Sequence, residues 1–212
     1  MKAAVLYKFG KSPRYEDFRD PTPGDGETLI QVKAVALENI DRALARGSHF
    51  ATKQFLPHLP AVVGLDGIGM LDDGRLIGFG ALHSPYGAMA EMAVVPNQQY
   101  APIPDGVDAA VAAAVPGSAL TALFPLRWGV QLQQGETVLV NGATGFTGKL
   151  AIQIARLLGA GRIVATGRNE ASLQRLPDLG ADSVIDLKQS DASVISALKR
   201  EAAAGYDVIL DF

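Results

Sequence analysis

The sequence predicts an α/β protein in which a β-rich part is followed by a parallel sheet covered by helices. Two patterns predict this: short apolar runs separated by turn signals before residue 107, and alternating strand-like and helix-like segments after it. A glycine-rich loop follows one of the strands in the second part. At 212 residues, 48% of them hydrophobic, the chain can form one large domain or two smaller ones.

The first part is expected to consist of short strands, with one helical turn at Ile40–Ala45. Breaker sequences such as DPTPGDGE and LDDG separate the apolar runs. Many short strands at this spacing favour an all-β barrel or a β-sandwich. The expected strands are Lys2–Tyr7, Thr28–Leu37, Arg75–Phe79, Met89–Val95 and Tyr100–Ile103.

The second part is expected to alternate helices with strands. Its strands are nearly continuous apolar runs, as is typical of strands buried on both faces. Three strand–helix–strand units in a row predict a parallel sheet with right-handed crossovers. Helices are expected at Ala109–Val115 (stopped by Pro116), Ala119–Leu126, Lys149–Leu158, Glu170–Leu179 and Ala192–Ala204, and strands at Thr137–Val140, Arg162–Thr166, Ser183–Leu187 and Asp207–Phe212.

The composition excludes several classes of site. The chain has no cysteine, which excludes disulfides, thiolate zinc sites, iron–sulfur ligation and cysteine nucleophiles. None of its three histidines lies four residues from another, which excludes a helical zinc motif. The net charge of −3 argues against a strongly basic nucleic-acid-binding surface. Because no signal peptide or membrane-spanning stretch is evident, we expect a cytoplasmic protein without a membrane partner.

The segment Val138–Gly148, VLVNGATGFTG, is predicted to bind the phosphates of a dinucleotide. It follows a buried strand and opens a helix, which is the context such a glycine pattern requires. Gly145 would let the backbone approach a pyrophosphate at the positive helix end, and Gly148 would let helix and strand pack closely. The alternative is a glycine-rich turn without a ligand. The predicted cofactor-binding residues are Gly142, Ala143, Thr144, Gly145, Phe146, Thr147 and Gly148.

The end of the second strand is predicted to select the nucleotide. An NAD-specific site normally carries Asp or Glu there, bound to the ribose 2′-hydroxyl, whereas this chain has no acidic residue before Glu170. Arg168 could instead bind a 2′-phosphate through two hydrogen bonds. The alternative is a surface arginine at the start of a helix. We therefore predict Gly167, Arg168 and Asn169 as further contacts to NADP(H).

Six stretches of the chain match an ordered set of family motifs. The most specific is Gly135–Gln153, which matches the pattern G-x-x-V-L-V-x-G-A-T-G-x-x-G-x-x-A-I-Q. The others are Met1–Leu6, Gly26–Ala34, Leu59–Gly69, Tyr86–Pro96 and Gly180–Asp186. With them the chain resembles the zinc-independent medium-chain dehydrogenase/reductases, the quinone oxidoreductase-like proteins. The resemblance implies a GroES-like β-barrel domain over residues 1–117 and a Rossmann doubly wound parallel sheet over residues 118–212.

The chain departs from the zinc-dependent branch of that family at two positions. Zinc-dependent relatives place a catalytic Cys three residues before Asp41 and a His after Gly64, where this chain has Glu38 and Leu65. Without thiolate and imidazole a catalytic zinc has no adequate ligand set, so no metal is expected. Ala43 also stands where quinone reductases often carry a Tyr, so the substrate pocket is expected to differ from theirs.

The resemblance implies an NADPH-dependent oxidoreductase that transfers a hydride to a quinone, a conjugated enone or a small carbonyl substrate without zinc. In such an enzyme the nicotinamide supplies the hydride, while the protein orients it and excludes water. The family's cleft positions imply Asn39 and Asp41 as catalytic residues, although either could equally cap the helix at Ile40–Ala45. Thr121 is implied beside the nicotinamide, with a core or helix-start role as its alternative. The second hypothesis is a non-enzymatic NADPH-binding redox sensor or partner protein.

The strand count predicts that the chain is part of a longer protein. The family's Rossmann sheet has six strands, and Asp207–Phe212 would be the fourth, so we expect an incomplete domain with an unpaired edge strand. We expect a full-length chain of roughly 300 residues or more, the usual size of two such domains. That full-length form is expected to be a homodimer with a small-molecule substrate and no nucleic-acid partner.

Overall fold

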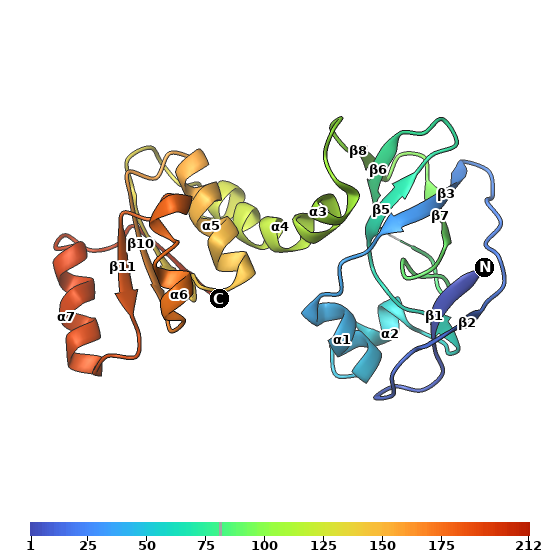
Figure 1. Ribbon diagram of the computed structural model, residues 1–212, viewed down its shortest axis with the longest axis horizontal. Helices are drawn as coiled ribbons and strands as arrows, with labels where there is room; N and C mark the ends of the chain where they lie inside the picture. Colours follow the sequence, from blue (N-terminus) through green and yellow to red (C-terminus); the bar gives the residue numbers. More distant parts are fainter. Residues whose placement is uncertain (81) are drawn as a thin grey trace. The chain divides into compact units, whose positions relative to one another are not determined.

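The computed structural model of the protein describes residues 1–80 and 82–212. The chain divides into two compact units, Met1–Val115 and Pro116–Phe212 (Figure 1). The first unit is built on antiparallel sheets and the second on a parallel sheet. The domain boundary expected after residue 117 stays a prediction.

The first unit contains two antiparallel sheets. Its strands are β1 (Lys2–Leu6), β2 (Arg14–Asp17), β3 (Glu27–Ala34), β4 (Ala61–Val62), β5 (Gly67–Met70), β6 (Leu76–Phe79), β7 (Met92–Pro96) and β8 (Tyr100–Pro102). The larger sheet has the order β7-β3-β5-β6-β8, and every neighbouring pair is antiparallel. In the smaller sheet β1 lies between β2 and β4.

Residues 89–91 join the two sheets into one curled β structure. The Ala4 N–H donates to the carbonyl oxygen of Met89 over 2.8 Å, and the Val32 N–H donates to that of Glu91 over 2.9 Å. One short segment is therefore hydrogen-bonded to β1 of the small sheet and to β3 of the large one. This continuity favours the barrel over the sandwich that the sequence left open.

Three of these strands, β2, β4 and β5, lie where the strand pattern predicted none. In β5 the signal is weakened by Gly67 and Gly69, because glycine has no side chain to pack and is depleted in strands. Packing explains Gly69: a Cβ there would lie 2.5 Å from Cδ1 of Ile30 on the neighbouring strand. β4 has only two residues, too few for any periodic pattern.

In the described part of the first unit, residues 1–80 and 82–115, there are also three short helices, namely α1 (Asn39–Arg46), α2 (Thr52–Phe55) and α3 (Ala109–Ala114). α1 contains the expected helical turn and ends at Gly47, whose φ of 76° provides a left-handed cap. α3 begins after Asp108, whose carboxylate accepts hydrogen bonds from the N–H groups of Ala110 and Val111.

The second unit holds a four-stranded parallel sheet of β9 (Thr137–Asn141), β10 (Arg162–Gly167), β11 (Ser183–Asp186) and β12 (Val208–Asp211). The strand order is β11-β10-β9-β12. This is the 3-2-1-4 order of the first four strands of a Rossmann sheet, which confirms the expected fold class. The order reverses beside β9, and such a switch point at the carboxyl ends of the strands is where folds of this kind bind ligands.

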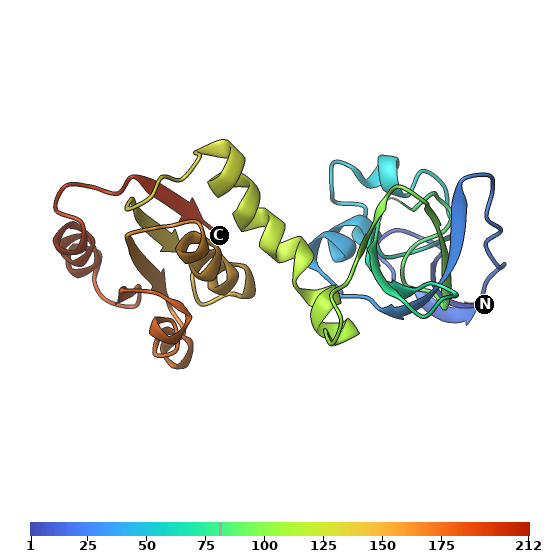
Figure 2. The ribbon, with the colours of Figure 1, turned by 90° about the horizontal axis from the view of Figure 1, so that it is seen from above.

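Helices cover both faces of this sheet (Figures 1 and 2). α5 (Phe146–Leu157) packs on the face that carries Val138 and Val140. α7 (Asp191–Glu201) packs on the opposite face, which carries Leu139. Successive residues of β9 therefore contribute to two cores, which explains the continuous apolar run in the sequence.

Two helices differ from expectation at prolines. Pro116 begins α4 (Pro116–Phe124), because the first turn of a helix tolerates a residue without an N–H, and α4 continues into a π-helix over Pro125–Gly129. The single helix expected over Glu170–Leu179 is instead α6 (Glu170–Leu173) followed by a 3₁₀ helix, Pro177–Leu179. Pro177 cannot donate the hydrogen bond that a continuous helix needs there.

Candidate functional site

The glycine-rich loop connects the end of β9 to the start of α5. The Ala143 N–H donates to the carbonyl oxygen of Thr166 on β10 over 2.8 Å, and the Gly145 N–H donates to that of Gly142 over 3.2 Å. α5 begins at Phe146, three residues before its expected start, so the last part of the loop is already helical. The segment thus has the strand–turn–helix geometry of a phosphate-binding loop.

The glycines of the loop are required for different reasons. Gly142 has a φ of 77°, in the left-handed region that favours glycine. A Cβ on Gly148 would lie 2.6 Å from both Cα of Ala143 and the carbonyl oxygen of Gly142. A Cβ on Gly145, by contrast, would meet only the Gly142 oxygen at an ordinary 3.6 Å, and its φ of −74° suits any residue. The described chain therefore leaves the space beside Gly145 open to a ligand.

The N-terminus of α5 offers backbone donors at this open space. Its N-cap is Gly145, which has no side chain to accept a hydrogen bond from the first turn. The earliest backbone bond into the helix is from the Lys149 N–H to the Gly145 oxygen, 3.1 Å long, so the N–H groups of Phe146 and Thr147 have no intrahelical acceptor. These donors and the positive end of the helix dipole fit an anionic group such as a pyrophosphate.

A cavity of about 330 Å³ opens beside the loop. Arg168 is exposed and lines the same cavity as the loop residues, so the residue predicted to bind a 2′-phosphate and the phosphate loop share one site. Gly167 brings β10 close to the loop, because a Cβ there would lie 2.4 Å from Cγ2 of Thr144. The cavity is lined by Asn141, Gly142, Thr144, Gly167, Arg168, Leu187 and Phe212.

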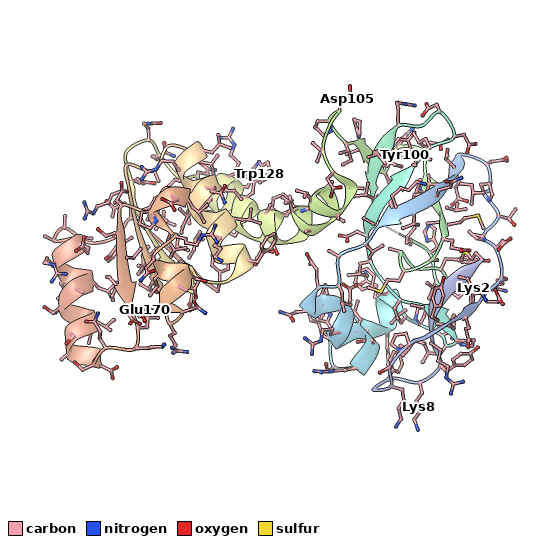
Figure 3. The ribbon with its side chains drawn as sticks, viewed as in Figure 1. Lys2, Lys8, Tyr100, Asp105, Trp128 and Glu170 are labelled. Carbon is pink, nitrogen blue, oxygen red and sulfur yellow. The ribbon has the colours of Figure 1, made fainter. Side chains whose placement is uncertain are left out.

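Asn169 and Glu170 belong to the start of α6. The Asn169 side-chain oxygen accepts a hydrogen bond from the Ser172 N–H over 2.9 Å, so Asn169 is the N-cap of α6. Glu170 is the first residue of that helix (Figure 3). Neither is among the described lining residues of the cavity, so the end of β10 presents a guanidinium to it rather than a carboxylate.

Six other predicted cofactor residues, Gly145 and Gly148 among them, lie outside the described lining of this cavity. Ala143 is fully buried, Phe146 is exposed, and Thr147 is half-buried. Thr121 is exposed on α4, and its hydroxyl donates to the carbonyl oxygen of Gly117 over 2.9 Å. That local helix contact agrees with the alternative interpretation of Thr121 and leaves a cofactor role for it as a prediction.

Sequence reasoning missed three residues of the cavity, Asn141, Leu187 and Phe212. Asn141 ends β9, while Leu187 and Phe212 each follow the last residue of β11 and β12. The carboxyl edge of the parallel sheet therefore brings together residues that are far apart in sequence. Their position at strand ends is the signal that could have identified them.

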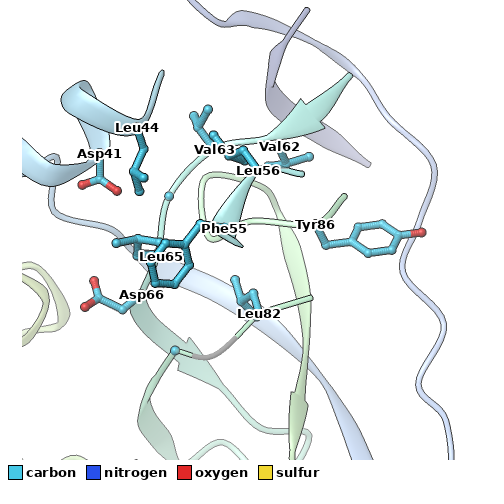
Figure 4. A pocket seen from close by; sticks show the side chains of 12 residues that line it. Asp41, Leu44, Phe55, Leu56, Val62, Val63, Leu65, Asp66, Leu82 and Tyr86 are labelled. Carbon is cyan, nitrogen blue, oxygen red and sulfur yellow. The ribbon is translucent and has the colours of Figure 1, made fainter. Parts of the chain in front are cut away.

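The first unit has a pocket of its own, with a volume of about 260 Å³ (Figure 4). Asp41 lines it from α1 and Asp66 from the segment before β5, whereas Asn39, exposed at the start of α1, is not among its described lining residues. Most of the remaining lining is apolar. It comprises Leu44, Phe55, Leu56, Val62, Val63, Gly64, Leu65, Gly80, Leu82 and Tyr86.

Asp41 is almost fully buried, with 7% of its surface exposed. One carboxylate oxygen, Oδ2, accepts a hydrogen bond from the Glu38 N–H over 2.9 Å, the contact that the capping interpretation requires. The other, Oδ1, is buried and has no hydrogen-bond partner within residues 1–80 and 82–212. Burial raises the pKa of Asp41, while backbone N–H groups of Glu38 and Leu65 partly offset that rise.

Two further acidic residues lie near Asp41. Burial raises the pKa of Glu38, and the charges of Asp66 and Asp41 raise it further. Partial burial of its carboxyl group also raises the pKa of Asp66, an otherwise exposed residue, and the charge of Asp41 adds to that. The charge of Asp41 therefore opposes the ionisation of both Glu38 and Asp66. In the described part of the chain, no three His, Cys, Asp or Glu residues are arranged to hold a metal ion.

Known proteins resemble this chain over its whole length. A family model described as zinc-binding dehydrogenase matches residues 147–212. A quinone oxidoreductase of Pseudomonas aeruginosa is 28% identical, over 84% of this chain and 56% of its own length. The quinone oxidoreductase of Thermus thermophilus, solved also as a complex with NADPH, is 32% identical with a TM-score of 0.85, over 100% of this chain and 66% of that one. This chain belongs to the medium-chain dehydrogenase/reductase family.

The family predicted from the motifs is thereby confirmed, and its members named here are oxidoreductases. A trans-enoyl reductase of Aspergillus terreus is 29% identical over 89% of this medium-chain dehydrogenase/reductase and 55% of its own length. The chain thus spans only about half the length of these curated relatives. The zinc-binding dehydrogenase match begins at residue 147, so it does not cover Glu38 or Leu65. Within the described residues, each helix is too short or too polar to cross a membrane.

Proposed function

We propose that this medium-chain dehydrogenase/reductase is an NADPH-dependent oxidoreductase that transfers a hydride to a quinone, a conjugated enone or a small carbonyl substrate without zinc. The observation that carries the proposal is the open space at Gly145, beside the uncapped N-terminus of α5. Its quinone oxidoreductase and enoyl reductase relatives support the reaction class. The NADPH complex of the Thermus relative supports a nucleotide with a 2′-phosphate.

In this proposal the chain's own residues bind and orient the nucleotide. The backbone N–H groups of Phe146 and Thr147 bind the pyrophosphate, and Gly145 leaves room for it. Arg168 binds the 2′-phosphate from the cavity that it lines together with Gly142 and Thr144 of the loop. Bound NADPH supplies the hydride. Thr121 is proposed as a further contact on the nicotinamide side. To make that contact, its hydroxyl would either give up the hydrogen bond that it donates to the Gly117 carbonyl oxygen or accept a second hydrogen bond while keeping it.

Asn39 and Asp41 are the residues proposed to act on the substrate. Asn39 is exposed at the first position of α1, where its amide can donate to a substrate oxygen. Asp41 lines the pocket of the first unit with one unpartnered carboxylate oxygen. A cytoplasmic location and a homodimer of the full-length protein belong to the same proposal.

Nucleotide titration and an oxidation assay test the proposal together. NADPH should bind this chain at least about tenfold more tightly than NADH, since a charge-assisted contact to the 2′-phosphate is lost with NADH. The full-length protein should then oxidise NADPH in the presence of a quinone or an enone. Failure of both nucleotides to bind would overturn the cofactor assignment. Binding without turnover on any acceptor in the full-length protein would favour the redox-sensor hypothesis instead.

Zinc independence has its own test. Elemental analysis of the purified protein should give much less than one zinc per chain, and chelators should leave turnover unchanged, because Glu38 and Leu65 replace the thiolate and imidazole that catalytic zinc requires. One zinc per chain, together with turnover that is lost to chelators, would overturn this part of the proposal.

A further inference from the structure

We infer that a second cavity of the second unit, the Trp128 cavity, binds a planar aromatic carboxylate. It has a volume of about 360 Å³ and is lined by Arg127, Trp128, Gln131, Leu132 and Gln133. None of these five is among the described lining residues of the cavity beside the glycine-rich loop or of the first unit's pocket. The site is therefore separate from both sites of the proposed function, and the inference does not rest on that function.

The Trp128 cavity lies at the amino end of β9. Its first two lining residues belong to the π-helix Pro125–Gly129, and residues 130–136 connect that helix to β9. In this connection the Gly135 N–H donates to the carbonyl oxygen of Gly159, just after α5, over 2.9 Å. The glycine-rich loop follows the opposite, carboxyl end of the same strand. A ligand in the Trp128 cavity would therefore leave the nucleotide site free.

The backbone around this cavity has two uncommon features. The Val130 N–H donates to the Pro125 carbonyl oxygen, five residues earlier, over 2.8 Å, which is the hydrogen bond of a π-helix. Gln131 has a φ of 53°, in the left-handed region that residues other than glycine seldom adopt. Both features occur preferentially at functional sites. Here they bring residues of a helix and of the following loop around one cavity.

Trp128 provides an aromatic surface for the ligand. It is 62% exposed, although tryptophan is highly buried on average, and it is labelled in Figure 3. Its ring makes an edge-to-face contact with Phe124, with the ring centroids 5.2 Å apart and the ring planes at 70°. That contact supports the indole while part of its surface stays open to solvent. A planar aromatic ring can stack on this open part.

Arg127 determines the charge of the ligand. It is exposed, and none of the ion pairs within residues 1–80 and 82–212 involves it. It is also the one charged residue in the described lining of the Trp128 cavity. A carboxylate can accept two parallel hydrogen bonds from its guanidinium, whereas a cationic ligand would be repelled.

The other lining residues complete a polar cavity with one apolar wall. Leu132 packs against the hydrophobic core of the second unit. Nε2 of Gln133 donates to the backbone carbonyl oxygen of Gln131, which ties the loop to itself. Both glutamine amides have further hydrogen-bonding capacity for a second polar group on the ring. The chemistry of the lining thus fits an aromatic ring that carries a carboxylate.

Binding can be followed through Trp128, the only tryptophan of the 212 residues. Benzoate, cyclohexanecarboxylate and benzyl alcohol are titrated into the chain at neutral pH without nucleotide, with tryptophan fluorescence and ligand-observed NMR as readouts. Benzoate should quench the fluorescence saturably, with a dissociation constant on the order of 1 mM. It should bind at least about fivefold more tightly than the other two, because one cannot stack and the other has no charge. Equal affinities, or no saturable binding of benzoate, would overturn the inference.

Two variants test the two contacts. Arg127→Gln removes the charge but keeps a polar side chain, so benzoate affinity should fall at least about fivefold, to that of benzyl alcohol. Trp128→Leu should weaken benzoate similarly, as measured by NMR, and cyclohexanecarboxylate less. Arg175→Gln, which changes an exposed arginine outside the described lining, should keep the original affinity. Unchanged affinity in Arg127→Gln, or an equal loss in Arg175→Gln, would overturn the inference.

Addition of saturating NADPH tests the location. Benzoate bound in the Trp128 cavity should keep its affinity beside NADPH, whereas displacement by NADPH would place it in the loop cavity, near Arg168, and overturn the inference. If NADPH does not bind at all, the proposed function fails, and the three compounds and the variants still decide the inference. If NADPH binds and benzoate does not, the inference fails alone. Should a variant not fold, the three compounds on the unaltered chain decide the question.

Discussion

The hydroxyl of Thr166 on β10 donates a hydrogen bond to Oδ1 of Asn141 on β9 over 2.5 Å. Asn141 in turn donates from its Nδ2 to Oδ1 of Asp211 on β12 over 2.7 Å. Three neighbouring strands are thereby linked by one chain of side-chain hydrogen bonds at their carboxyl ends. Asn141 lines the cavity beside the glycine-rich loop, so these two hydrogen bonds set the orientation of its side-chain amide there.

Thr166→Val should destabilise the second unit by about 1 kcal/mol. Thr166 is 1% exposed, and valine keeps its shape but removes the donor to Asn141. Urea unfolding of the variant and the unaltered chain measures the difference. Thr121→Val, which removes an exposed hydroxyl on α4, serves as the control and should change stability by less than about 0.5 kcal/mol. Equal effects of the two substitutions would contradict a structural role for the Thr166–Asn141 bond.

Gly148→Ala and Gly145→Ala should separate folding from nucleotide binding. The new Cβ at position 148 would lie 2.6 Å from Cα of Ala143 and from the carbonyl oxygen of Gly142, so we expect a loss of stability of about 2–3 kcal/mol. At position 145 the Cβ meets no atom of the chain closer than 3.6 Å, so stability should stay the same while NADPH binding weakens at least about tenfold. Urea unfolding and nucleotide titration measure both effects. Full nucleotide affinity in Gly145→Ala would show that the open space is not used.

The second unit was predictable because its signals are local. The apolar run of β9 and the glycine spacing that follows it lie within one short stretch, so Gly145 could be assigned from neighbouring residues alone. The apolar pattern reports which face of a helix is buried, but not which backbone hydrogen bonds form. It therefore predicted neither the π-helix after Phe124 nor the interruption at Pro177. Strands β4 and β5 were missed because two residues, or a run with two glycines, carry too weak a pattern.

The candidate sites were predictable only in part, because they combine residues that are distant in sequence. Leu187 and Phe212 reach the cavity through the order of the parallel strands, which no local pattern encodes. Asp41 was found through a family motif, yet its burial and its proximity to Asp66 depend on how α1 packs near the segment before β5. The residues of the glycine loop are thus close in sequence, whereas the residues that line the first unit's pocket come together only in the folded chain.

Asp66→Asn should stabilise the chain at neutral pH and have no such effect at acid pH. The pKa of Asp66 is raised in the folded chain, so ionisation costs stability as the pH rises from the unfolded value of about 3.9 through the raised one. Removing the charge should add on the order of 0.5 kcal/mol at pH 7, a figure that allows for solvent screening at this exposed residue. The gain should shrink as the pH falls and vanish at about pH 3, below the unfolded value, where the carboxyl group is protonated in both the folded and the unfolded chain.

Urea unfolding at both pH values checks this prediction. Asp105→Asn is the control, because Asp105, labelled in Figure 3, is an exposed loop residue whose charge is not among the causes of the raised pKa values of the three clustered acids. It should leave stability nearly unchanged at either pH. A gain for Asp66→Asn that stays undiminished at about pH 3 would show that it does not come from charge.

Arg168→Ala should weaken NADPH binding by about 1–3 kcal/mol and leave NADH binding little changed. The reason is that Arg168 lines the loop cavity at the end of β10, where no carboxylate is placed to receive a ribose hydroxyl. Titration of both nucleotides measures the two losses. Arg168→Lys keeps the positive charge but not the two-pronged geometry, so its loss of NADPH affinity should be intermediate. Equal losses for NADPH and NADH in Arg168→Ala would place Arg168 on another part of the nucleotide and remove the basis for NADPH preference.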